Sequence, residues 1–189
     1  MKGRSPVLAI ENDPMASPYS LYGAIKEQAI PEQLEGRSVL DIGGYDGRFA
    51  KVCFDRGAAP VAVLDSQEWR AYHGGVWPSP RQFDGISYQL GDFMEREEGA
   101  DLVLFYNVLY HCKDWLGALP KVRQLTKWRL CLSTFFAQGT GWVGYTDSGP
   151  QEQRATPSVP ALFRALTAAG FLVYESIVLK GDHIILRCG

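Results

Sequence analysis

The stretch from Ser38 to Ala50 constrains the fold more than any other part of the sequence. Val39 to Ile42 is a short apolar run interrupted by one acid, Asp41, which is typical of a buried strand. Apolar residues recur at helical spacing from Phe49 onward. Between the two segments lie three glycines within five positions: Gly43, Gly44 and Gly47. A strand, a glycine turn and a helix in this order direct a helix N-terminus into the crevice where open α/β sheets bind their ligands.

The glycine spacing also bears on which ligand the turn serves. A dinucleotide fingerprint needs the pattern G-x-G-x-x-G. Counting back from Gly47 gives Gly44 and then Ile42, so the first glycine is missing. The spacing therefore argues against a nucleotide-dependent oxidoreductase, which stays open as an alternative.

Further apolar segments predict the rest of a single sheet. We expect strands at 38–42, 60–65, 86–90, 101–106, 129–135, 171–179 and 183–188. We expect helices at 19–30, 47–57, 115–126 and 159–169, with a short one at 66–72, and a binding loop at 136–157. The last two strands flank a turn at 180–182 and predict an antiparallel hairpin. The fold class is therefore α/β, a Rossmann-like doubly wound and mostly parallel seven-stranded sheet with a C-terminal antiparallel hairpin.

Length and charge narrow the class of protein. The 189 residues favour one domain over 19–189, with an irregular N-terminal arm over 1–18. The formal charge of −2 gives no general positive field to attract a polyanion. Cys53 and Cys131 lie in apolar segments and read as core residues, and no metal site is expected. The sequence has no signal peptide and no membrane-spanning run, so we expect a cytoplasmic protein.

Acids at the ends of two strands fit an adenosine ligand. Asp65 ends the second strand and can accept hydrogen bonds from both ribose hydroxyls, with Ser66 beside it; the alternative is a carboxylate that caps the next helix. Asp92 follows the third strand and is placed to accept the exocyclic amine of adenine, with Phe93 offering an apolar face. A turn aspartate is the alternative for Asp92.

Three segments resemble class I S-adenosyl-L-methionine (SAM) methyltransferases. Residues 39–49 are similar to the D-I-G-x-[aromatic]-D-G-x-[aromatic] variant of motif I, with Tyr45 where a glycine is usual. Residues 107–111 with Asp114 resemble the V-L-Y-H segment after strand four, and residues 156–171 resemble the late helix. Over 36–189 the chain is similar to the tRNA wobble-uridine 5-oxyacetic acid methyltransferase-like group.

That resemblance implies SAM as cofactor and gives several residues a role. Asp41 would lie near the methionine amino group, Asn107 beside the methionine moiety, and the glycine turn, including Tyr45, against the cofactor. His111 is the best candidate for a general base, because it follows strand four and histidine titrates near neutrality; the alternative is a histidine that orients the loop.

The predicted function is methyl transfer from SAM to an oxygen or nitrogen of a small or conjugated acceptor. RNA methylation, as in the wobble-uridine group, and a non-catalytic SAM-binding protein are the alternatives. The N/D-P-P-Y/F signature of amino-methyltransferases is absent, since residues 107–110 read N-V-L-Y. Together with the lack of an evident basic surface, this places RNA second.

Overall fold

The computed structural model of the protein describes residues 18–66, 83–138, 143–147, 153–179 and 183–189. The helices are α1 (Pro18–Ala29), α2 (Arg48–Asp55), the 3-10 helix η1 (Leu109–His111), α4 (Trp115–Leu125) and α5 (Val159–Ala168). The strands are β1 (Val39–Ile42), β2 (Val61–Asp65), β3 (Ile86–Leu90), β4 (Ala100–Tyr106), β5 (Thr126–Phe135), β6 (Val143–Asp147), β7 (Gln153–Pro157), β8 (Val173–Leu179) and β9 (His183–Cys188).

Seven of the strands form one sheet in the order β3-β2-β1-β4-β5-β9-β8. The five strands from β3 to β5 are parallel, and β9 runs antiparallel to both β5 and β8. This confirms the predicted sheet and its C-terminal hairpin. The strand order reverses between β1 and β4, and a reversal of this kind opens a crevice at the carboxyl ends of the strands.

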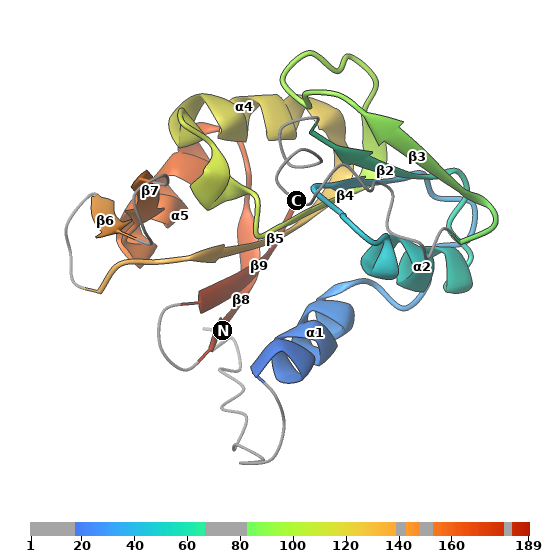
Figure 1. Ribbon diagram of the computed structural model, residues 1–189, viewed down its shortest axis with the longest axis horizontal. Helices are drawn as coiled ribbons and strands as arrows, with labels where there is room; N and C mark the ends of the chain where they lie inside the picture. Colours follow the sequence, from blue (N-terminus) through green and yellow to red (C-terminus); the bar gives the residue numbers. More distant parts are fainter. Residues whose placement is uncertain (1–17, 67–82, 139–142, 148–152, 180–182) are drawn as a thin grey trace, which may run out of the picture.

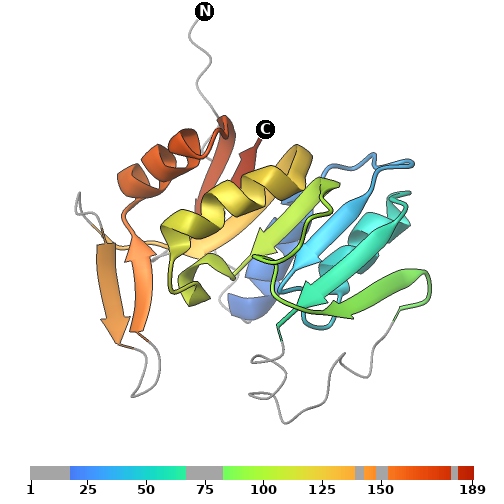
Figure 2. The same cartoon turned by 90° about the horizontal axis from the view of Figure 1, so that it is seen from above.

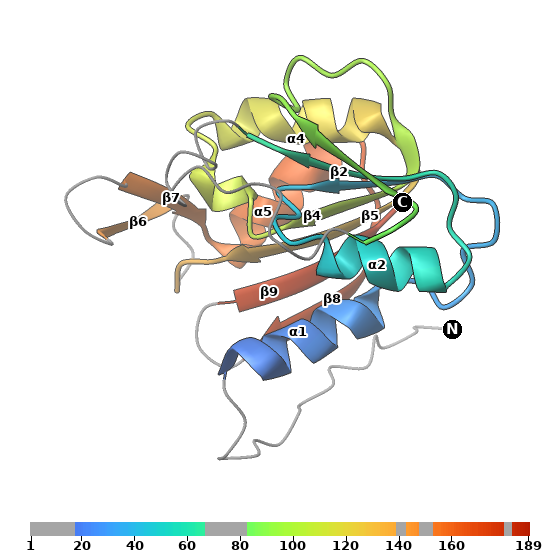
Figure 3. The same cartoon turned by 45° about the vertical axis from the view of Figure 1, so that its right-hand side comes forward.

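Helices cover both faces of the sheet (Figures 1 and 3). Alternate residues of β4 face opposite layers, as the two-residue period of a strand requires. Val103 and Phe105 pack in the core cluster under α4 and α5, whereas Leu102 and Leu104 pack in the cluster that includes Ala50 of α2. Helix α1 packs its Ile25 and Ala29 side chains against β8 and β9. Both clusters are therefore anchored on the strands whose ends form the crevice.

The segment 136–157 contains a hairpin, where the sequence predicted a loop. Strands β6 and β7 pair with each other in antiparallel fashion and stand apart from the main sheet (Figure 2). The backbone N–H of Ala137 donates to the carbonyl of Pro157 at 3.0 Å, which joins the hairpin to the end of β5. Strand β7 lies against η1. A two-stranded hairpin outside the sheet lacks the buried apolar runs that reveal the other strands.

The structure tests several further predictions made from the sequence. Strand β5 begins at Thr126, three residues before the predicted position, because it pairs with Ala100 of β4 there. Ser158 caps α5 as predicted, accepting from the backbone N–H of Ala161 at 3.4 Å. Cys53 and Cys131 are buried core residues. The predicted arm before Pro18, the predicted helix at 66–72 beyond Ser66, and the turn 180–182 lie outside the described residues.

Candidate functional site

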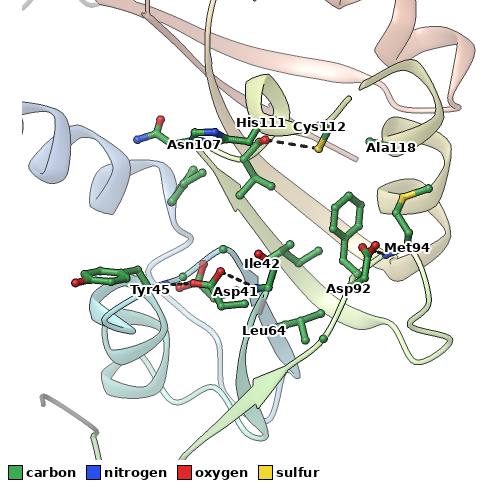
Figure 4. Close-up of a pocket in the computed structure, with 18 of the residues that line it drawn as sticks. Asp41, Ile42, Tyr45, Leu64, Asp92, Met94, Asn107, His111, Cys112 and Ala118 are labelled. Carbon is green, nitrogen blue, oxygen red and sulfur yellow. Dashed lines mark hydrogen bonds between the residues drawn. The ribbon is translucent and has the colours of Figure 1, made fainter. Parts of the chain in front are cut away.

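A cavity of about 1080 Å³ opens at the carboxyl ends of β1, β2 and β4 (Figure 4). It collects nearly all the side chains that the sequence singled out from four separate segments. The predicted residues that line it are Asp41, Gly43, Gly44, Tyr45, Asp65, Ser66, Asp92, Phe93, Asn107 and His111. Gly47 is the predicted residue that does not line it.

The glycine turn is shaped by close contacts on both sides. A Cβ on Gly44 would lie 2.5 Å from the carboxyl group of Asp41, so any other residue at this position would clash with that carboxyl group. Gly47 has a φ of 72° and starts α2, and a Cβ there would lie 2.5 Å from the hydroxyl of Tyr88. The need for glycine at 47 is thus explained by the left-handed backbone and by packing on β3.

Tyr45 adopts the backbone conformation that a glycine would take at this position. Its φ is 45°, in the left-handed region that costs a residue with a side chain about 1–2 kcal/mol. The residue is 38% exposed, and its ring points away from Asp41 (Figure 4). The backbone N–H of Tyr45 donates to Oδ2 of Asp65 at 3.1 Å. The turn therefore keeps its shape without the usual glycine, and the tyrosine ring leaves the cavity open.

Asp65 is held at the tip of β2 by backbone donors. Oδ2 accepts from Tyr45, and Oδ1 accepts from the N–H of Ser66 at 2.8 Å. The residue is 5% exposed and lines the cavity. A carboxylate fixed in this way at the cavity wall is an acceptor suited to a ligand with paired hydroxyls.

Asp41 and Lys26 place two buried ionisable groups in the same cavity. Asp41 is 1% exposed and its Oδ2 has no hydrogen-bond partner, and burial raises its pKa to about 8. Lys26 is 5% exposed, with Nζ 5.6 Å from the Tyr106 ring and 5.9 Å from the Phe49 ring. Burial, followed by the charge of Arg48, lowers the pKa of Lys26 to about 8. Lys26 was not among the site residues predicted from the sequence.

Asp92 and Phe93, which follow β3, belong to a turn and also line the cavity. Oδ1 of Asp92 accepts from the backbone N–H of Met94 at 2.9 Å, so this exposed aspartate does stabilise its own turn. It also lines the cavity, as adenine recognition would require. Phe93 packs edge-on against Phe105 at 5.4 Å between ring centroids and presents the rest of its ring to the cavity.

The end of β4 turns sharply at Asn107. Its φ is 61°, a conformation that asparagine tolerates better than most residues. Its N–H donates to the carbonyl of Ser133 at 2.9 Å, and its Oδ1 accepts from the Ser133 hydroxyl at 3.2 Å. The turn leads into η1, where His111 is exposed at the cavity and its ring lies 4.3 Å from that of Tyr110.

The charge of the lining is predominantly negative. The described lining residues include six acidic and three basic side chains: Asp41, Asp46, Asp65, Asp92, Glu95 and Asp114 against Lys26, Arg48 and Lys113. Asp41, with a pKa of about 8, holds its proton at neutral pH. Within the part of the chain that the structure describes, no group of three or more histidine, cysteine or acidic side chains is arranged to hold a metal ion. No helix among those residues is long and apolar enough to cross a membrane.

Comparison with known proteins gives a family and a fold. The sequence profile described as "Methyltransferase domain" matches residues 18–176. A SAM-dependent methyltransferase from Mesorhizobium loti is similar in structure, with a TM-score of 0.65 and 15% identity over 87% of this chain and 95% of that one.

Two further solved structures share the fold. The Burkholderia thailandensis 1,6-didemethyltoxoflavin-N1-methyltransferase, solved with its acceptor and S-adenosylhomocysteine, has a TM-score of 0.62 and 18% identity over 94% of this chain and 92% of that one. The mitomycin 7-O-methyltransferase MmcR has a TM-score of 0.62 and 19% identity over 90% of this chain and 54% of that one. A search of curated proteins found no match.

Proposed function

Because the chain belongs to the methyltransferase domain family and is a SAM-dependent methyltransferase, we propose that it methylates an oxygen or nitrogen of a small or conjugated acceptor. The observation that carries the proposal is the acidic lining of the cavity. Even with Asp41 protonated, the acidic side chains around the site outnumber the three basic ones, and they oppose the approach of a phosphate backbone. An uncharged or cationic small acceptor meets no such barrier.

The buried pair Asp41 and Lys26 supports a place for the amino-acid end of the cofactor. That end is a zwitterion, with an ammonium and a carboxylate. Asp41 offers an unpartnered buried oxygen for the ammonium, and Lys26 offers a buried ammonium for the carboxylate. Buried charges need partners of opposite sign, and the zwitterion supplies both at once.

The remaining lining residues suit the other parts of the cofactor in this proposal. Asp65 accepts from the ribose hydroxyls, beside the N–H groups of Tyr45 and Ser66 that hold it. Asp92 and Phe93 receive adenine, and Asn107 lies beside the methionine moiety. The cavity slightly exceeds the roughly 300–1,000 Å³ usual for one small ligand, which leaves room for an acceptor as well.

For methyl transfer, the protein has to align the acceptor atom with the methyl group and remove the acceptor's proton. When bound, SAM supplies an electrophilic methyl group on a positively charged sulfur. The cavity walls hold the acceptor atom in line with that group, which accounts for several kcal/mol of the barrier. His111 removes the acceptor proton, a contribution of roughly 10²–10⁴-fold. Of the two similar proteins, the Burkholderia enzyme is named as an N-methyltransferase and MmcR as an O-methyltransferase.

A methyl-transfer assay with labelled SAM tests the proposal. The purified protein is offered a small-molecule extract and, separately, total tRNA. We expect label in small molecules and none in tRNA. The Asp65→Ala variant should lose both transfer and at least tenfold in S-adenosylhomocysteine affinity, whereas Asp84→Ala, an exposed acid before β3, should lose neither. Label in tRNA alone would contradict the proposed acceptor and favour the RNA alternative.

A further inference from the structure

The Asp41 carboxyl group is enclosed beneath the glycine turn and still belongs to the wall of the cavity (Figure 4). The residue is 1% exposed, and a Cβ on Gly44 would lie 2.5 Å from the carboxyl group. Its Oδ2 has no hydrogen-bond partner in the part of the chain that the structure describes. An ionised oxygen buried in this way without a partner is costly, so in the free protein the group favours its neutral, protonated form.

The charged groups around Asp41 do not compensate for this burial. The pKa of Asp41 is raised to about 8, mainly by burial and also by the charges of Asp65 on β2 and Asp46 in the turn. A backbone hydrogen bond from Ala50 of α2 and, with the smallest effect, the charge of Lys26 on α1 act in the opposite direction. Two further titratable groups interact with Asp41 and are kept uncharged by burial: Cys53 of α2 and Tyr106 of β4. Among the described residues, no ion pair joins Asp41 to Lys26.

Lys26 is the second buried ionisable group at this end of the cavity. Its Nζ lies near the rings of Phe49 and Tyr106. Because burial and then the charge of Arg48 lower the pKa of Lys26 to about 8, its ammonium form still predominates at neutral pH. The free site therefore holds one proton on Asp41 and one on Lys26 at neutral pH, and the pair carries a net positive charge.

We infer that binding of SAM is coupled to loss of the Asp41 proton, so that the affinity of the site for its cofactor depends on pH. The inference rests on the proposed function, which puts the amino-acid end of the cofactor at Asp41 and Lys26, and it adds the regulation of that site. On binding, the O–H bond of Asp41 breaks, its proton passes to solvent, and the resulting carboxylate faces the cofactor's ammonium group. Lys26 keeps its proton and faces the cofactor's carboxylate. An opposite charge within about 4–6 Å favours the ionised form of a carboxyl group, so the ammonium group acts from the open cavity without entering the space around Oδ2.

The coupling fixes the direction and the size of the pH dependence. The form that binds tightly has Asp41 ionised and Lys26 protonated, and this form is most abundant near pH 8, where both groups are half titrated. Below that pH, Asp41 is increasingly protonated, so the affinity should be roughly 20-fold lower at pH 6 than at pH 8. Above pH 8 the loss of the Lys26 proton lowers the affinity again.

Calorimetric titration with S-adenosylhomocysteine, which has the same amino-acid end as SAM, measures both the affinity and the protons released. The titrations are made at pH 6, 7 and 8, each in two buffers with different ionisation enthalpies. We expect the affinity to rise roughly 20-fold from pH 6 to pH 8. Close to one proton should be released per bound ligand at pH 6 and almost none at pH 8. The fragment 5′-methylthioadenosine, which lacks the amino-acid end, should show neither effect.

Variants then assign the released proton to Asp41. Asp41→Asn keeps the shape of the neutral acid, so it should fold, and it should bind S-adenosylhomocysteine with nearly the same affinity at pH 6 and pH 8 and without proton release. Lys26→Met should bind more weakly at each pH and still release a proton at pH 6. Asp84→Asn removes an exposed acid before β3 and is the matched control, which should keep the pH dependence of the wild type.

The outcomes separate this inference from the function on which it rests. Equal affinity of the wild type for S-adenosylhomocysteine at pH 6 and pH 8 overturns the coupling. A pH dependence that persists in Asp41→Asn, or that 5′-methylthioadenosine shares, overturns the role of Asp41. A wild-type protein that binds no S-adenosylhomocysteine at any of the three pH values would instead be a failure of the cofactor site.

Discussion

Replacing Asp41 by asparagine should make the free protein more stable at neutral and alkaline pH. Asp41 is fully enclosed at the end of β1, and its Oδ2 has no partner among the described residues. Burial raises its pKa from 3.8 to about 8. Between these values the folded protein holds a proton that the unfolded chain has lost, so stability falls as pH rises.

The size of this change in stability follows from the raised pKa of Asp41. Each pH unit in the window from about 4 to 8 removes roughly 1.4 kcal/mol from the free energy of unfolding, on the order of 5 kcal/mol across the whole window. Asparagine has nearly the same shape as the protonated acid and never ionises. Asp41→Asn should therefore match the wild type near pH 4 and exceed it increasingly toward pH 8, while binding S-adenosylhomocysteine more weakly.

Urea unfolding at pH 5, 6, 7 and 8 measures the difference directly. The gap in unfolding free energy between Asp41→Asn and the wild type should widen with each step. Asp92→Asn alters an exposed acid of the same cavity and serves as the control, with no widening gap. Parallel pH curves for Asp41→Asn and the wild type would refute the reasoning, because they would mean that the Asp41 carboxyl has an ordinary pKa in the folded protein.

Three other substitutions test separate parts of the site. Gly44→Ala should lose about 1–3 kcal/mol of stability in urea unfolding and most S-adenosylhomocysteine binding, because the new Cβ would meet the Asp41 carboxyl. Gly91→Ala is the control, since a Cβ there makes only an ordinary contact at 3.6 Å. Equal losses in the two variants would contradict the crowding at Gly44. Asn107→Ala should cost about 1–2 kcal/mol in thermal unfolding and Asn107→Gly less, since the backbone there is left-handed; the reverse order would disprove strain as the cause. His111→Ala should lower turnover by roughly 10²-fold or more with S-adenosylhomocysteine affinity unchanged, and undiminished turnover would remove His111 as the base.

Much of this fold could be predicted because the inner strands of its sheet are buried on both faces. Strands in the interior of a sheet that helices cover on both faces need nearly continuous apolar runs. The runs at 101–106 and 183–188 mark the parallel β4 and the antiparallel β9 to within a residue. Acids at the ends of such runs, Asp41 and Asp65, are conspicuous for the same reason. The cavity could therefore be assembled from strand ends alone.

What the sequence did not reveal depends on tertiary contacts. Lys26 on a helix normally lies in solvent, and its burial arises only when α1 packs over the Phe49 and Tyr106 rings. Its position one residue after Ile25 and four after Tyr22, on the apolar side of the helix, was the available signal.

Calorimetric titration of the purified protein with SAM, S-adenosylhomocysteine and NAD in parallel shows which cofactor the cavity binds. We expect the first two to bind with dissociation constants on the order of micromolar and NAD not to bind, because Gly44 is packed against the Asp41 carboxyl and the turn lacks the dinucleotide spacing. Binding of NAD, or no binding of SAM and S-adenosylhomocysteine, would contradict the assignment of this cavity to the methyl donor.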